Sequence, residues 1–176
     1  MTLHWHWAPG AGGLLALVPD SLLGSALQGD VALSMPPSAA AVQPLHLTCL
    51  ASRSMAPLVE VLDPQIVLAT LPRIEQLGFD PTVFVAERGP HPDKDPPHVT
   101  TPRRTGFLAA DAASQAHCHA VLQAVVTALD RASRAQGGPP FPHPEPERFF
   151  HLSVWNNRGG APRRSIGDIR RDDCMR

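Results

Sequence analysis

The chain has no tyrosine, only three cysteines among its 176 residues, and almost no net charge. A formal charge of −1 gives no overall positive field, so contact with nucleic acid would need a local basic patch. Cys49, Cys118 and Cys174 have neither a metal-ligand spacing nor an even number for disulfides, which is typical of a reducing cytosol. No apolar run approaches the ~20 residues of a membrane helix, and the N-terminus lacks a signal peptide's basic region. These absences predict a cytoplasmic protein without a membrane partner.

The residues that are present are typical of a globular core. The hydrophobic share is 43%, and the length allows one domain or two small fused lobes. Twenty prolines predict many stiff loops. Arginines are concentrated in a basic C-terminal segment, residues 156–176, at Arg158, Arg163, Arg164, Arg170, Arg171 and Arg176.

Two short stretches carry the same pattern of histidine, apolar residue, small hydroxyl residue and apolar residue. They are residues 44–50 (PLHLTCL) and 149–155 (FFHLSVW). Side chains alternate along an extended strand, so His46 shares one face with Thr48, and His151 shares one face with Ser153. Each stretch is therefore predicted to be a half-buried strand with an imidazole beside a hydroxyl. Two such strands side by side would form a cleft suited to acid/base chemistry on a phosphate ester.

The rest of the chain predicts an α+β arrangement. Asp63 and Pro64 favour a helix start, as N-cap and first helical residue, and Pro72 is expected to kink or split this helix. Residues 21–34 are ambiguous, with a short helix as one possibility. The other elements predicted are strands at 14–18, 82–85 and 106–110, a long amphipathic helix at 112–135, and loops at 36–40, 88–97 and 136–147.

The paired histidine strands resemble the 2H phosphoesterase superfamily, which includes bacterial 2′,5′ RNA ligase-like proteins and 2′,3′-cyclic nucleotide phosphodiesterases. The resemblance covers roughly residues 13–155. It implies a two-lobed, pseudo-symmetric α+β fold in which helices pack outside antiparallel sheets around a central cleft, with residues 1–176 as one domain. It also implies a hydrolase that needs no metal or cofactor and acts on a 2′,3′-cyclic phosphate or 2′,5′-phosphodiester of RNA ends or nucleotides in RNA processing. No stable protein partner is inferred.

The same resemblance implies roles for four residues. The family's product is a 2′-phosphate, formed when the 3′-oxygen departs. On that basis His46 is assigned as the general acid and His151 as the general base, and the reverse assignment stays open. Thr48 and Ser153 would donate hydrogen bonds to the non-bridging phosphate oxygens. A cyclic phosphodiester is strained and carries one charge only, so this chemistry requires no metal ion.

Three further residues are candidates for substrate binding. Strand alternation predicts that Trp155 lies on the face of His151, where it would stack a nucleobase or close the interface between the lobes. Arg158, in the segment after the second strand, is suited to bidentate phosphate contact, the alternative being a solvated basic tail. Arg53, just past the first strand, is another phosphate candidate.

Two other interpretations stay open. In the first, the same cleft is a non-catalytic module that binds a nucleotide or an RNA end. In the second, the chain is a different α+β domain whose histidines are incidental, which predicts that the two strands are not adjacent. A zinc site at residues 117–119 (HCH) is rejected, because on a helix His117 and His119 point about 200° apart.

Overall fold

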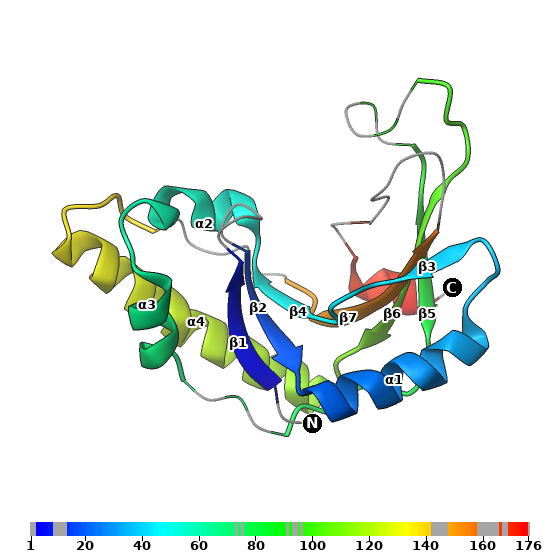
Figure 1. Cartoon of the computed structure of the whole chain (residues 1–176), viewed down its shortest axis with the longest axis horizontal. Helices are drawn as coiled ribbons and strands as arrows, with labels where there is room; N and C mark the ends of the chain where they lie inside the picture. The colour runs from blue at the N-terminus through cyan, green and yellow to red at the C-terminus, as the bar shows by residue number, and fades with distance from the viewer. Residues whose placement is uncertain are drawn as a thin grey trace.

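The computed structural model shows a mixed α+β protein. It describes residues 3–8, 14–72, 74, 76–90, 92, 95, 97–141, 148–157, 166 and 169–175. Their elements are β1 (Leu3–Ala8), β2 (Leu14–Pro19), α1 (Ser21–Ser34), β3 (Ala39–Ala41), β4 (Leu47–Leu50), α2 (Ser52–Val59), α3 (Pro64–Thr70), β5 (Phe84–Arg88), β6 (Arg103–Ala109), α4 (Ala112–Ala135), β7 (His151–Asn157) and η2 (Arg171–Met175). The strands form two antiparallel sheets, the first sheet in the order β1-β2-β4 and the second sheet in the order β3-β7-β6-β5. Figure 1 shows the sheets side by side, with α2, α3 and α4 around the first and α1 beside the second.

The first sheet builds its core with α2, α3 and α4. Leu15 and Leu17 of β2 and Leu47 of β4 are fully buried, as their apolar runs predict. The long helix predicted at 112–135 is confirmed as α4, and its apolar stripe packs into the same cluster. Asp111 is its N-cap and accepts a hydrogen bond from the Ser114 N–H.

The second sheet is covered on both faces. On one face, Leu108 and Leu152 pack with Val31 of α1. On the other face, Phe107 and Ala109 pack with apolar residues of the C-terminal segment. A sheet with two buried faces needs apolar residues at successive positions rather than strict alternation, as β6 shows at residues 107–109.

Several local predictions are confirmed and others are wrong. Asp63 caps α3, accepting from the Gln65 N–H at 2.8 Å, and the helix ends at Thr70, before Pro72. The loop predicted at 36–40 is wrong in part, since β3 begins at residue 39. The helix α2 was not predicted, because it has no side-chain cap and contains Pro57, both of which argue against a helix in sequence.

The chain crosses from the second sheet to the first just before β4. The Val42 N–H donates to the Val154 carbonyl at 2.9 Å, which extends the pairing of β3 with β7 by one residue. Residues 43–46 then lead into β4, and β4 and β7 contact each other. The two predicted histidine strands therefore meet where the two sheets meet (Figure 1).

Candidate functional site

The imidazoles of His46 and His151 are each held by a hydrogen bond to the backbone carbonyl two residues earlier. His46 precedes β4, and its Nδ1 hydrogen-bonds to the Pro44 carbonyl at 2.8 Å. His151 begins β7, and its Nδ1 hydrogen-bonds to the Phe149 carbonyl at 3.1 Å. A carbonyl oxygen can only accept, so Nδ1 carries the proton in each ring. Each neutral imidazole consequently presents an unprotonated Nε2.

The surroundings of His151 keep its imidazole neutral. Burial is the main cause that lowers the pKa of His151 from its ordinary 6.5 to about 4, and the nearby charges of Arg148 and His46 add to this. The hydrogen bond that His151 donates to the Phe149 carbonyl raises the pKa and is the second-largest effect, and the Asp173 carboxylate raises it slightly, but burial outweighs both. At pH 7 the ring is therefore free to accept a proton, as a general base must.

The two histidines lie near each other. A positive charge on His46 lowers the pKa of His151, and the strands β4 and β7 are in contact. Contact between these strands contradicts the interpretation in which they are not adjacent.

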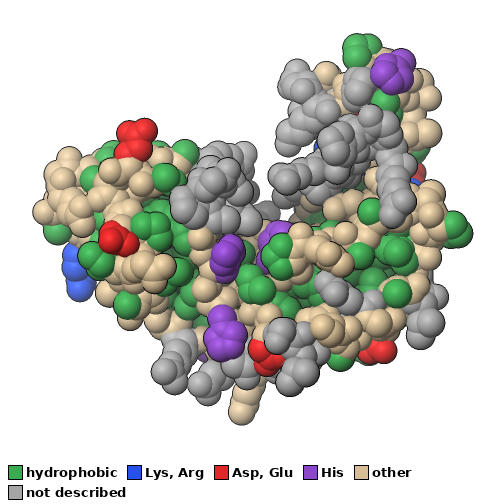
Figure 2. Space-filling view, in the orientation of Figure 1, with side chains coloured by type: hydrophobic (Ala, Val, Ile, Leu, Met, Phe, Trp, Pro, Cys, Tyr) green, Lys and Arg blue, Asp and Glu red, His purple; other side chains and the backbone are tan. Residues whose placement is uncertain are grey.

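Few described Lys or Arg side chains are visible on the face shown in Figure 2, which agrees with the absence of an overall basic field.

The two hydroxyls lie beside the histidines as predicted. On β7, His151 is paired with Ala109 and Ser153 with Phe107, so the imidazole and hydroxyl share a face. In the first stretch, His46 and Thr48 are half-buried while the intervening Leu47 is fully buried. A hydroxyl can donate one hydrogen bond, so Thr48 and Ser153 have the chemistry needed to bind a phosphate oxygen.

Arg148 is a site residue that the sequence did not single out. Its Nη2 donates to the Thr48 carbonyl at 2.8 Å, and its guanidinium lies 6.0 Å from the centroid of the Phe150 ring. Arg148 thus joins the entry of β7 to β4 and places a positive charge near His151. Alternation assigns position 148 to the apolar side of its strand, and only the length of the arginine side chain lets it reach Thr48. Its one sequence signal is a basic residue three positions before His151.

Replacing Arg148 with methionine should weaken the fold modestly and raise the pKa of His151. Loss of the charged hydrogen bond to the Thr48 carbonyl is expected to cost about 1–2 kcal/mol of unfolding free energy. The pKa of His151 rises because a neighbouring positive charge is gone. Denaturant unfolding and NMR titration measure the two effects. Arg134→Met, which removes an exposed ion pair with Asp130, is the control and should change neither quantity appreciably.

Trp155 lies on the face opposite to the one predicted, and this is a correction. Gly106 pairs with Trp155 and Phe107 pairs with Ser153, so Val154 is an extra residue in β7. This β-bulge breaks the alternation and turns the indole into the cluster of Leu152 and Val154, where it is 2% exposed. A ring buried to this extent has no face on which to stack a nucleobase.

Gly106→Ala should destabilise the second sheet. A Cβ at position 106 would overlap the Nε1, Cε2 and Cδ1 atoms of Trp155, and the indole cannot move without disturbing its cluster. Overpacking of this kind is expected to cost about 2 kcal/mol, measured by denaturant unfolding. Gly89→Ala is the matched control, because a Cβ there meets no atom within 4 Å. Equal stability of the two variants would contradict the packing described.

The two arginine candidates cannot be placed at the site. Arg53 lies in α2, but its side chain is outside the described part of the chain, as is all of Arg158. Asn156 and Asn157, the first two residues of the basic C-terminal segment, belong to β7. Their side chains bond within the sheet, Asn156 to the Thr105 hydroxyl at 2.6 Å.

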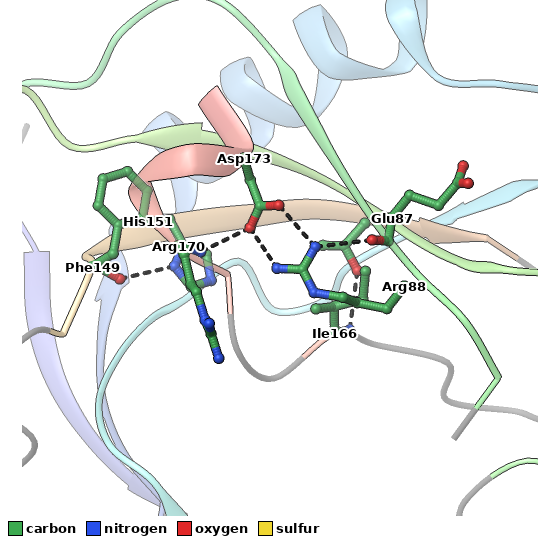
Figure 3. A network of polar contacts seen from close by, with 8 residues as sticks. Glu87, Arg88, Phe149, His151, Ile166, Arg170 and Asp173 are labelled. Atoms are coloured by element: carbon green, nitrogen blue, oxygen red, sulfur yellow. Dashed lines mark hydrogen bonds and ion pairs between the residues drawn. The ribbon is translucent and has the colours of Figure 1, made fainter. Parts of the chain in front are cut away.

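The end of the basic C-terminal segment docks beside the site rather than extending into solvent. The Arg88 guanidinium forms two hydrogen bonds to the Asp173 carboxylate, at 2.8 and 2.7 Å, as seen in Figure 3. The Asp173 side chain is 3% exposed. Ile166 and Ile169 are buried against the face of the second sheet that carries His151. This segment therefore covers the apolar part of that face.

A cavity of about 630 Å³ lies elsewhere. Its lining includes Val31 of α1 and Leu108 of β6, which pack on the face of the second sheet opposite to His151. The cavity is thus separate from the histidine site.

Comparisons with known proteins assign no family. No protein-family model matches the chain, and no similar curated protein was found. Within the described ranges, no group of three or more His, Cys, Asp and Glu side chains could hold a metal ion. No described helix is long and apolar enough to cross a membrane.

Proposed function

We propose that the protein is a phosphoesterase of the 2H type, with that superfamily's two-lobed fold. Its substrate would be a 2′,3′-cyclic phosphate, or a 2′,5′-phosphodiester, at RNA ends or in nucleotides. One observation carries the proposal. Two neighbouring imidazoles, one directly before β4 of the first sheet and one at the start of β7 of the second, each donate Nδ1–H to the carbonyl two residues earlier and are each followed two positions later by a hydroxyl residue.

The arrangement suits hydrolysis by paired acid/base catalysis. Neutral His151 would take a proton from water through Nε2 while the water oxygen forms a bond to phosphorus. The bond from phosphorus to the 3′-oxygen would break, and protonated His46 would give that oxygen a proton, leaving a 2′-phosphate. The reverse pairing of the two histidines uses the same geometry. No step in this scheme is assigned to a metal ion.

The neighbouring groups would stabilise the phosphate. Thr48 and Ser153 can donate hydrogen bonds to its non-bridging oxygens as charge develops there. Arg148, whose charge acts at His151, would attract the same anion. A bound anion would in turn raise the pKa of His151 towards neutrality and strengthen it as a base.

The surface charge favours a small or terminal substrate. The chain has a net charge of −1, so nothing draws a long polyanion to the protein as a whole. A cyclic mononucleotide or an RNA end needs only the groups at the histidine cleft. A cytoplasmic role in RNA processing fits this substrate class.

Hydrolysis of a 2′,3′-cyclic mononucleotide in EDTA tests the proposal. We expect turnover in the absence of free metal, with the 2′-phosphate as product. Binding without turnover, by calorimetry, would select the non-catalytic binding module instead. Absence of both, for the cyclic nucleotide and for a 2′,5′-linked dinucleotide, would refute the proposal.

A further inference from the structure

One peptide unit connects His151 to a buried glutamine on another element. The carbonyl of the Phe149–Phe150 peptide accepts the hydrogen bond from His151 Nδ1 at 3.1 Å. The N–H of the same peptide donates to Gln115 Oε1 at 2.9 Å. A peptide unit is planar and rigid, so a group that fixes its N–H also fixes the direction of its carbonyl.

The amide of Gln115 has one orientation available. Its Nε2 donates to the Phe150 carbonyl at 2.8 Å and to the Ala110 carbonyl at 3.2 Å. A flipped amide would place its NH₂ against the Phe150 N–H and its oxygen against two carbonyls. Gln115 is 7% exposed, so water could not compensate for these losses.

The Gln115 side chain makes hydrogen bonds to the backbone of Phe150 of the kind that a neighbouring strand would make. The paired ladder of β6 and β7 ends at Ala109 and His151, and the Ala110 N–H adds one further bond to the Phe150 carbonyl. Gln115, in the second turn of α4, then supplies an acceptor and a donor to the backbone of Phe150. The segment that delivers His151 into the site is thereby held against α4.

We propose that Gln115 is a positioning residue for His151. Through the Phe149–Phe150 peptide it fixes the proton on Nδ1 and the orientation of the ring, which leaves Nε2 unprotonated. The kinetic part of this inference depends on the proposed function. The effect on the imidazole does not, because the ring can be observed directly.

The wild-type protein already tests the inference. Proton–nitrogen correlation NMR spectra of the imidazoles report which ring nitrogen carries the proton. We expect His151 at pH 7 to be neutral and protonated on Nδ1. A proton on Nε2 would overturn the inference, because Nδ1 would then have nothing to donate to the Phe149 carbonyl.

Gln115→Met removes both hydrogen-bonding groups while keeping the side-chain length. In this variant we expect the Nε2-protonated form of His151 to become populated and its NMR titration midpoint to fall, since the bond to Phe149 raises the pKa of His151. The tautomer of His46, anchored to Pro44, should not change. Gln123→Met, at an exposed position on the same helix, is the control. An unchanged His151 in folded Gln115→Met would overturn the inference.

Gln115→Glu keeps the acceptor for the Phe150 N–H and separates positioning from general packing. We expect His151 to remain protonated on Nδ1 in this variant, and the opposite result would overturn the inference even if Gln115→Met fails to fold. In kinetics, Gln115→Met should lower kcat about 10- to 100-fold, with KM within about threefold, the usual scale for loss of an orienting partner. If the wild type shows no turnover while the NMR results hold, the proposed function fails and the positioning role stands.

Discussion

Replacing either His46 or His151, the proposed catalytic pair, with glutamine is expected to lower kcat for 2′,3′-cyclic phosphate hydrolysis by about 100- to 10,000-fold. Glutamine has a similar size and can hydrogen-bond, but it cannot exchange a proton near neutral pH. KM should change far less, because in the proposed site Thr48 and Ser153 would still donate hydrogen bonds to the phosphate and Arg148 would still attract it. Steady-state kinetics in EDTA on His46→Gln and His151→Gln measures the effect.

The pH profiles of the two variants also decide their roles. If His151 is the base, His151→Gln loses the acidic limb of the profile and His46→Gln loses the basic limb. His98→Gln, at an exposed position in the loop before β6, serves as the control and should keep full activity. Turnover that survives both active-site substitutions would remove the histidines from the mechanism.

Acidification should destabilise the protein through His151. An unfolded histidine titrates near 6.5, whereas the pKa of His151 in the folded protein is about 4. Between these values the unfolded chain binds more protons, so the free energy of unfolding falls as the pH falls. The unfolding free energy is unaffected by this titration above pH 6.5, and at pH 4 it is lower by about 3 kcal/mol.

Comparison with His151→Gln isolates this contribution from other titrating groups. The unfolding free energy of the wild type minus that of the variant should decrease by about 3 kcal/mol from pH 7 to pH 4. Urea unfolding at several pH values measures it. Arg148→Met should show a smaller loss, because the pKa of His151 lies closer to 6.5 in that variant. A wild type whose stability parallels that of His151→Gln would show that the imidazole is not desolvated.

Local rules of sequence predicted the parts of the site that depend on adjacent residues. Alternation placed His151 beside Ser153, and His46 beside Thr48, because the two-residue period needs only an extended backbone. The apolar stripe of α4 and the Asp63 cap follow from similarly local geometry. Ile166 and Ile169 are buried as well, as two large aliphatic residues in an otherwise polar segment favour.

The tertiary structure decided the rest, because it depends on which segments become neighbours. Trp155 turns inward at a bulge defined by its pairing with β6, a partner that the local pattern does not contain. Arg148 reaches Thr48, and Gln115 reaches Phe150, across 100 and 35 residues of sequence. The sequence by itself therefore identified the two histidines and two hydroxyls that are the candidates for the chemistry. The packing of β4 against β7 and of α4 beneath them determined that these side chains meet, because contacts between distant residues are set by the whole fold.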